Sequence, residues 1–238
     1  MINTDTTTFE NIFKKEVLDL FAPNEIELTE KFYKYYIHLT ETNKKFNLTA
    51  ITEQEAVITK HFADSLLPLQ AGILTKDMKC ADIGTGAGFP GLPLAMLRPD
   101  IHMTLVDSLK KRLNFIDEVL QITDTTNCET VHARAEDHAK SGNREKYDLV
   151  FSRAVSRLAS LTELCLPLVK VGGKMVALKS KTAKEELVEA QKVIELLGGK
   201  AEEIFGTEER NLIIITKIAP TPPIYPRKAG TPEKFPII

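Results

Sequence analysis

The chain of 238 residues is long enough for one large α/β domain with a modest extension, and its 43% hydrophobic and 27% charged content is that of an ordinary globular protein. The formal net charge of −2 argues against a general nucleic-acid binder, and the widely separated Cys80, Cys128 and Cys165 argue against a zinc site or a disulfide framework. There is no signal-like N-terminus and no apolar run near the roughly 18 residues that cross a bilayer, so we expect a cytoplasmic protein without a membrane partner.

Residues 1–70 are predicted to form an N-terminal helical extension. Apolar and aromatic side chains recur there at helical spacing, at Phe32, Tyr35, Tyr36 and Leu39. Thr29 is the expected N-cap of this helix, because its hydroxyl can accept a hydrogen bond from an unpaired amide. The segment KKFNLTAI (44–51) interrupts the helix, and EQEAVITKHFADSL (53–66) resumes the helical pattern.

Short apolar runs alternate with amphipathic segments from about residue 78 onward. The runs predict strands at 79–84, 101–107, 127–132, 147–152 and 174–179, and the segments predict helices at 90–98, 109–122, 156–169 and 182–197. This alternation predicts a parallel sheet covered by helices on both faces. AEEIFG and RNLIIITKI then follow without a helix between them, so the sheet should end in an antiparallel hairpin. The predicted fold is therefore the Rossmann-like class I methyltransferase fold in residues 71–219.

The tail, residues 220–238, holds six of the twelve prolines and is expected to be extended rather than helical. Arg227, Lys228 and Lys234 make it basic, which suits an arm that reaches RNA phosphates. Charge is uneven elsewhere too, because residues 131–181 carry ten basic and five acidic side chains. A local basic surface can attract phosphate even on an acidic protein.

The strongest signal is the glycine loop DIGTGAGFPG, residues 82–91, which follows a predicted strand and opens a helix. Glycines allow positive φ and let a ligand lie close to the backbone, so Gly84 and Gly86 are expected to contact a cofactor. The next strand ends at Asp107, where a carboxylate can accept both hydroxyls of a ribose.

A glycine loop of this kind is typical of binding sites for two cofactors, a dinucleotide and S-adenosylmethionine. A dinucleotide requires GxGxxG, but the pattern counted from Gly84 fails at Phe89, and counted from Gly86 it carries Pro90 inside the turn. S-adenosylmethionine has no phosphates and carries a charged amino-acid end, whose ammonium Asp82 can balance directly or through water. The loop therefore favours S-adenosylmethionine.

The segment HARAED, residues 132–137, follows the third strand and is expected to pass the adenine. There the backbone at Ala135 and the carboxylate of Glu136 can read the adenine edge, unless Glu136 merely caps a helix. Arg134, Arg153 and Lys179 follow the third, fourth and fifth strands at the same edge of the sheet, as candidates to position the substrate.

Six segments together resemble the bacterial ribosomal RNA small-subunit methyltransferase G family, also called glucose-inhibited division protein B. They are NLTAI, HFADSL, DIGTGAGFPGLPLA, HARAED, SRAVSRL and YPRKAGTPEKFPI, and they extend from about residue 44 to the C-terminus. The family often has a tryptophan before NLTAI, whereas this chain has Thr42 near that position, so packing of the N-terminal helices is in doubt there.

The resemblance implies methylation of ring nitrogen 7 of one guanine in 16S rRNA, near the decoding site, on rRNA or a small-subunit precursor. It also places S-adenosylmethionine against five residues: Gly84, Phe89, Ala135, Glu136 and Arg153. We expect a monomer without a metal ion.

Nitrogen 7 of guanine has a free lone pair, so its methylation needs positioning but no general base. We therefore assign no acid or base, and an arginine near the base must leave nitrogen 7 free although arginine usually reads guanine there. Two alternatives remain at this point: an NAD(P)-dependent oxidoreductase, or a non-catalytic RNA-binding protein with a methyltransferase fold.

Overall fold

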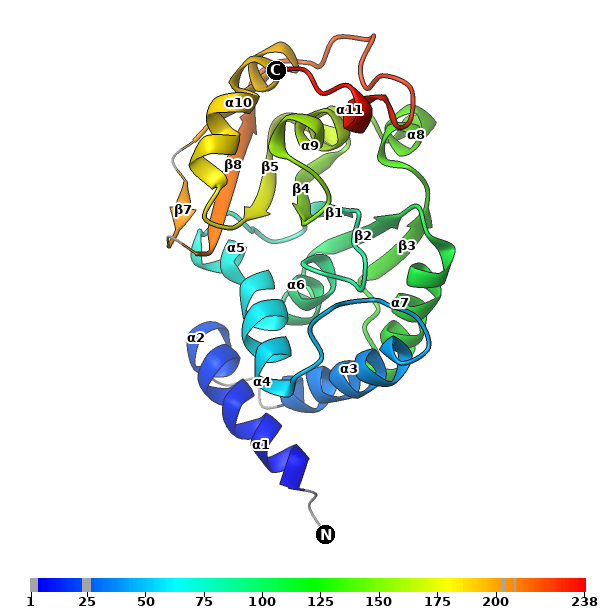
Figure 1. Ribbon diagram of the computed structural model, residues 1–238, viewed down its shortest axis with the longest axis vertical. Helices are drawn as coiled ribbons and strands as arrows, with labels where there is room; N and C mark the ends of the chain where they lie inside the picture. The colour runs from blue at the N-terminus through cyan, green and yellow to red at the C-terminus, as the bar shows by residue number, and fades with distance from the viewer. Residues whose placement is uncertain (1–3, 23–26, 203, 208) are drawn as a thin grey trace.

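The computed structural model describes residues 4–22, 27–202, 204–207 and 209–238. Its centre is one eight-stranded sheet with the order β3-β2-β1-β4-β5-β8-β6, in which β7 pairs with the edge of β8 (Figure 1). The strands are β1 Lys79–Ile83, β2 His102–Asp107, β3 Cys128–His132, β4 Tyr147–Arg153, β5 Val169–Lys179, β6 Gly199–Ala201, β7 Phe205–Gly206 and β8 Asn211–Lys217. β1 to β5 are parallel, whereas β8 is antiparallel to β5, β6 and β7. The predicted parallel sheet with an antiparallel end is confirmed.

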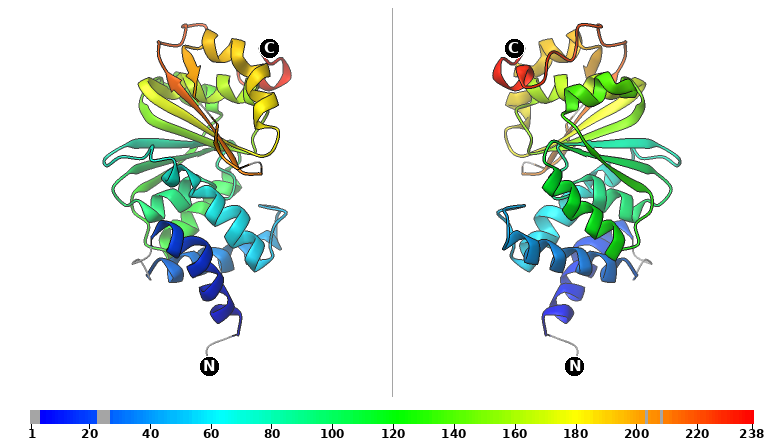
Figure 2. Two further views of the ribbon diagram at one scale, coloured as in Figure 1. Left: turned by 90° about the vertical axis from the view of Figure 1, so that its left-hand side faces the viewer. Right: turned by 90° about the vertical axis from the view of Figure 1, so that its right-hand side faces the viewer.

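Helices cover both faces of this sheet because the strands alternate between two hydrophobic clusters. In β8, for example, Leu212 and Ile214 face one cluster while Ile213 and Ile215 face the other. The first face carries α6 (Gly91–Leu97) and α7 (Lys110–Ile122), and the second carries α8 (Ala135–His138), α9 (Leu158–Cys165) and α10 (Ala183–Leu196). Figure 2 shows the sheet between these two layers.

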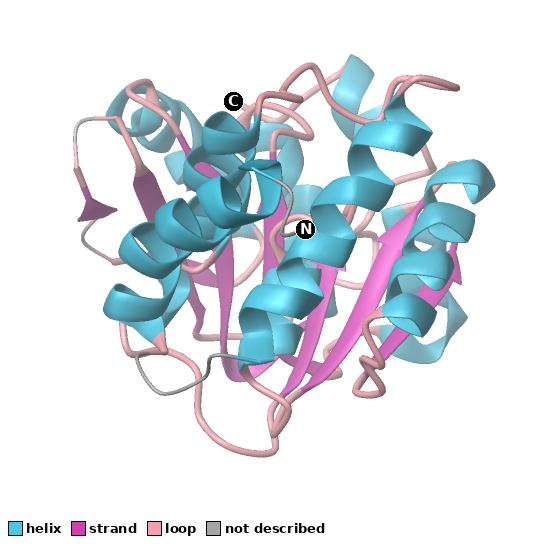
Figure 3. Ribbon diagram, turned by 90° about the horizontal axis from the view of Figure 1, so that it is seen from below, coloured by secondary structure: helices cyan, strands magenta, loops and turns pink. Residues whose placement is uncertain are grey.

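The N-terminal helices extend the first layer, on the side of α6 and α7 (Figure 3). They are α1 Thr4–Phe13, a π-helical turn Lys14–Leu18, α2 Asp19–Phe21, α3 Glu27–Asn43, α4 Gln54–Val57, a π-helical turn Ile58–Ala63 and α5 Leu67–Gln70. The predicted break at 44–51 is confirmed, and there the Asn43 side chain accepts hydrogen bonds from the Leu48 and Thr49 amides. The N-cap assigned to Thr29 is wrong, because Thr29 lies inside α3. None of the described helices is long and apolar enough to cross a membrane.

Residues 218–230 form neither helix nor regular strand, but Thr231–Lys234 form the short helix α11. The expectation that the tail is extended throughout is therefore wrong at α11. Figure 1 shows α11 against α9, on the side of the sheet opposite the N-terminal helices. The division of the chain at residues 70 and 219 stays a prediction.

Candidate functional site

The glycine loop between β1 and α6 is compact. Gly84 has φ of +70°, and a Cβ atom there would lie 2.4 Å from Cγ2 of Val155, in the loop after β4. The amides of Gly84 and Thr85 both donate to the carbonyl of Val106, which ties the loop to β2. Only glycine fits at position 84, both for its backbone conformation and for its close contact with Val155.

Asp82 supports this loop from beneath. Its side chain is fully buried, and Oδ2 accepts hydrogen bonds from Thr85 Oγ1 (2.7 Å) and Gly91 N (2.9 Å). A Cβ atom at Gly91 would lie 2.9 Å from the same oxygen, so glycine allows this contact. Burial raises the pKa of Asp82 to about 6. Asp82 Oδ1 is also buried and has no hydrogen-bond partner within the described residues, and contact of this carboxylate with a ligand ammonium, directly or through water, stays a prediction.

Asp107, at the end of β2, is also buried but faces a cavity. Its Oδ2 accepts a hydrogen bond from Gly86 N (3.0 Å) and a longer one from Arg112 (3.3 Å), and its Oδ1 accepts one from Leu109 N (2.8 Å). The side chain is thereby fixed at the carboxyl edge of the sheet, where ligands bind in open parallel sheets.

The cavity beside Asp107 has a volume of about 310 Å³. It brings together five of the predicted residues: Gly84, Asp107, Arg134, Ala135 and Glu136. Glu136 is buried, and its Oε1 accepts a hydrogen bond from Gly230 N (2.7 Å) in the tail. We call this the first cavity.

Phe89 and Arg153 do not line the first cavity. The Arg153 guanidinium lies over the Phe89 ring, 4.9 Å from its centroid, and donates to His61 Nδ1 (3.1 Å) and to the Lys60 carbonyl. His61 in turn stacks on Phe89 with ring centroids 4.6 Å apart. Burial, and then the charge of Arg153, lower the pKa of His61 to about 4, so this histidine is neutral near pH 7.

Arg153 and His61 instead line a second cavity of about 460 Å³, together with Asp64 and Arg210. Ala154 lines both cavities, so the two are neighbours on either side of the loop that follows β4. A cofactor and a substrate could therefore meet near Ala154.

Lys179 lines the second cavity but is not free. Its Nζ donates to Glu186 Oε2 (2.8 Å) and to the Ser156 carbonyl (2.7 Å), and its side chain is 9% exposed. Lys179 is thus held in the wall of this cavity by Glu186 and Ser156, and its role in positioning a substrate stays a prediction. Arg134, by contrast, is exposed.

Much of the basic stretch 131–181 is neutralised in the same way. Three of its other cations make ion pairs: Arg157 with Glu189, Lys170 with Asp148 and Lys174 with Glu202. Its ten positive charges therefore do not form one open surface.

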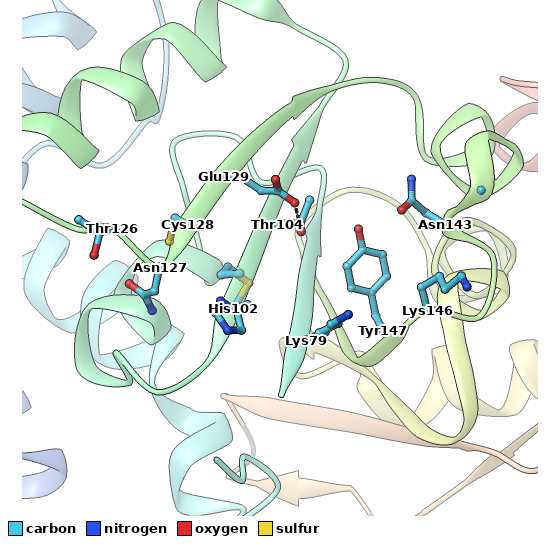
Figure 4. Close-up of a pocket in the computed structure, with 12 residues that line it drawn as sticks. Lys79, His102, Thr104, Thr126, Asn127, Cys128, Glu129, Asn143, Lys146 and Tyr147 are labelled. Carbon is cyan, nitrogen blue, oxygen red and sulfur yellow. Dashed lines mark hydrogen bonds between the residues drawn. The ribbon is translucent and has the colours of Figure 1, made fainter. Parts of the chain in front are cut away.

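A third cavity, of about 640 Å³, lies at the opposite edge of the sheet, where β1 to β4 begin (Figure 4). Lys79, His102 and Tyr147 line it, and Thr104 donates to Glu129 within it. It is larger than the first cavity but contains none of the predicted site residues. The glycine loop and the carboxyl ends of the strands are both at the other edge, which identifies the first cavity as the better candidate.

Several residues of the first cavity were not identified from the sequence, among them Arg112, Val155 and Glu233. Arg112 follows β2 by five residues and is one of three adjacent cations, Lys110, Lys111 and Arg112, at the start of α7. Val155 lies within SRAVSRL, but no pattern shows that it packs on Gly84. Glu233 comes from the tail, and only the folded chain brings it to this edge. In the described part of the chain, no group of three His, Cys, Asp or Glu side chains is arranged to hold a metal ion.

Known proteins that are similar in sequence match almost the whole chain. The model of the family described as rRNA small subunit methyltransferase G matches residues 28–214. A ribosomal RNA small subunit methyltransferase G from Clostridium novyi is 49% identical over 96% of this chain and 99% of its own length. One from Ligilactobacillus salivarius is 48% identical over 89% of this chain and 92% of its own.

Solved structures resemble the fold at low sequence identity. A precorrin-6y C5,15-methyltransferase from Geobacter metallireducens has a TM-score of 0.51 and is 20% identical to this chain, covering 71% of this chain and 90% of its own length. Such a likeness shows the shared class I fold alone.

Proposed function

The chain belongs to the rRNA small subunit methyltransferase G family, and we propose that it transfers the methyl group of S-adenosylmethionine to ring nitrogen 7 of one guanine in 16S rRNA. The observation that carries the proposal is the first cavity, because it joins Gly84, Asp107, Ala135 and Glu136 at the carboxyl edge of a class I sheet. The nitrogen and the site near the decoding region follow from the sequence resemblance. We propose a cytoplasmic monomer that acts on the rRNA or on a small-subunit precursor.

The residues of the first cavity fit the adenosine half of the cofactor. Asp107 offers carboxylate oxygens to the ribose hydroxyls, and of its three present bonds the one from Arg112 is the longest, so a hydroxyl would replace Arg112 most easily. Ala135 and Glu136 would take the adenine, and Gly84 lets the ligand approach the backbone. When bound, S-adenosylmethionine supplies an electrophilic methyl group.

The second cavity is our proposed site for the guanine. It adjoins the first at Ala154, and Arg153 is fixed in its wall by His61, Lys60 and Phe89. A guanidinium held in this way can orient the base, or a phosphate, without moving during the reaction. Arg153 is thus a positioning residue, and its contact with the cofactor, which the family pattern implies, stays a prediction.

No proton has to leave the attacking nitrogen, so the site needs no general base. The environment of His61 agrees with a base-free reaction. Its pKa is about 4 and both of its ring nitrogens are hydrogen-bonded, so it is poorly suited to base catalysis near pH 7. Alignment of the guanine lone pair with the methyl group is the chemical task that remains.

Isothermal titration calorimetry with S-adenosylmethionine, S-adenosylhomocysteine and NAD tests the proposal against its alternatives. We expect both adenosyl ligands to bind at one site and NAD to give no heat. Binding of NAD alone would indicate an oxidoreductase, and binding of none of the three would indicate a non-catalytic RNA-binding protein.

A further inference from the structure

The C-terminal segment, residues 218–238, folds back onto the elements that form the first cavity. Its anchor is Arg227, which donates through Nε and Nη2 to both carboxylate oxygens of Glu163 on α9, the shortest of these bonds being 2.6 Å. The Arg227 amide also donates to Glu163, whose side chain is almost completely buried. Figure 1 shows this part of the chain lying beside α9 and close to α8.

Other cations hold the same segment in place. Arg144 donates to the carbonyls of Thr221 and Tyr225, and Lys140 donates to the carbonyl of Arg227. These side chains belong to the basic stretch 131–181, so part of its charge binds the segment's own backbone and is not presented to RNA.

Two contacts connect the segment to the cavity itself. The Gly230 amide donates to Glu136, which is buried and lines the cavity. Three residues further on, α11 places Glu233 in the cavity wall. Glu233 is exposed and makes no hydrogen bond or ion pair within the described residues, so its carboxylate is available to a ligand.

We infer that the C-terminal segment completes the cofactor site, with Glu233 as a further binding residue for the adenosine half of S-adenosylmethionine and Arg227 as a positioning residue that holds α11 against α9. The inference rests on the proposed function. A carboxylate at this wall can accept hydrogen bonds from the hydroxyl or amine groups of adenosine. A bound adenosine exchanges water for the cavity wall, so these donor groups need acceptors from the protein.

The same contacts oppose the expectation that Arg227 reaches RNA phosphates. A phosphate that took Arg227 would leave Glu163 buried without its partner, which is strongly unfavourable. Lys228, one residue along, is exposed, and its side chain makes no hydrogen bond or ion pair within the described residues, so it remains free for RNA.

Two matched pairs of variants test the inference. Glu233→Ala removes the proposed contact, and Lys234→Ala, also exposed on α11, is its control. Arg227→Ala releases the anchor, Arg227→Lys keeps the charge, and Lys228→Ala removes the same charge outside the anchor. Calorimetry measures Kd for S-adenosylhomocysteine and for methylthioadenosine, which lacks the amino-acid end, and thermal unfolding is followed for every variant.

We expect Glu233→Ala and Arg227→Ala to weaken both ligands by about tenfold, the size expected for loss of a charge-assisted hydrogen bond. The loss should be equal for the two ligands, because both contain adenosine. Arg227→Lys should recover part of it, and both control variants should bind as the unmodified protein does. Glu233→Ala should unfold at an unchanged temperature, which separates a binding role from a structural one.

Unchanged affinity in Glu233→Ala would overturn the inference, even if Arg227→Ala failed to fold. So would a loss confined to S-adenosylhomocysteine, or weaker RNA binding by Arg227→Ala with the ligand Kd unaltered. If the unmodified protein bound neither ligand, the proposed function itself would fail, which is a distinguishable result.

Discussion

Asp82 and Asp107 show how two carboxylates at equivalent strand ends acquire different tasks. Each lies at or next to the end of a parallel strand and accepts hydrogen bonds from the glycine loop or its flanks. Asp82 lies beneath the loop, where burial favours its protonated form, whereas Asp107 lies beside the loop and lines the first cavity. Asp82 therefore holds the glycine loop in shape, whereas Asp107 lines the cavity in which we propose that the cofactor binds.

Replacing Asp107 with alanine should weaken S-adenosylmethionine binding by tenfold or more. The reason is the loss of charge-assisted hydrogen bonds to the ribose, each contributing on the order of 1.5–3 kcal/mol before relaxation. Asp137→Ala is the matched control, because Asp137 is exposed on α8 and does not line the cavity. Calorimetry should find the control unchanged, and equal Kd values for Asp107→Ala and the unmodified protein would show that the assigned site is wrong.

Asp82 should make the free energy of unfolding depend on pH. Its pKa is raised in the folded state to about 6, so the stability it contributes is complete below the unfolded value near 4 and is lost as pH rises toward 6. The loss is about 3 kcal/mol for a shift of this size. Denaturant unfolding of the unmodified protein and Asp82→Asn between pH 4 and pH 7 measures it: the variant should gain stability relative to the unmodified protein as pH rises, and a constant difference would contradict this.

Among the elements, the N-terminal helices are part of the site and not an appendage. Tyr35 on α3 donates to the carbonyl of Ala87 in the glycine loop, and its ring stacks on Phe89. His61 lies in the π-helical turn after α4. Its ring stacks on Phe89, and its Nε2 is hydrogen-bonded to the hydroxyl of Thr49 in the NLTAI segment. The helices thereby fix the orientation of Arg153 in the second cavity.

This packing predicts the effect of Arg153→Ala on catalysis. Single-turnover methyl transfer should slow by roughly 10–100-fold, because the base is less well aligned with the methyl group. The rate should stay flat from just above the low pKa of nitrogen 7 to the pH at which guanine ionises, in both the variant and the unmodified protein. A step near pH 6–7 that disappears in His61→Ala would contradict base-free transfer.

The loop after β4 and the start of α10 depend on Lys179. Lys179→Ala would leave Glu186 nearly buried without its cation, at a cost on the order of 3 kcal/mol of stability. Lys181→Ala, two residues along and exposed, should leave stability unchanged. Thermal unfolding compares the two, and lower RNA affinity in folded Lys179→Ala than in Lys181→Ala would return Lys179 to the RNA surface.

For the whole molecule, local patterns predicted the sheet and its order of elements well. Alternation of apolar runs with amphipathic segments is a local property, as is the glycine loop between a strand and a helix, so both were visible in the sequence. Contacts between side chains that are distant in the chain could not be predicted from such patterns. The Arg227–Glu163 pair joins residues 64 positions apart, so the sequence alone predicted a free basic arm for the tail. The ion pair of Lys179 with Glu186 is invisible in the sequence for a related reason, because a periodic pattern does not show which side chains pair.

The position of Glu233 is the clearest case of information that only the fold supplies. It lies about 100 residues after the loop HARAED, yet the two line the same cavity because the segment crosses α9 and returns to α8. The far end of the chain thereby contributes a side chain to the wall of this cavity.

The most direct test of the central claim is to map the methyl group on the RNA. Purified protein, labelled S-adenosylmethionine and 16S rRNA from cells lacking the gene are incubated, and the product is digested and analysed by mass spectrometry, with a reaction that contains no protein as the control. We expect a single 7-methylguanine at one position and none with the control. Label on an exocyclic amine or a ribose, or no label from protein that binds the cofactor, would contradict the proposed reaction.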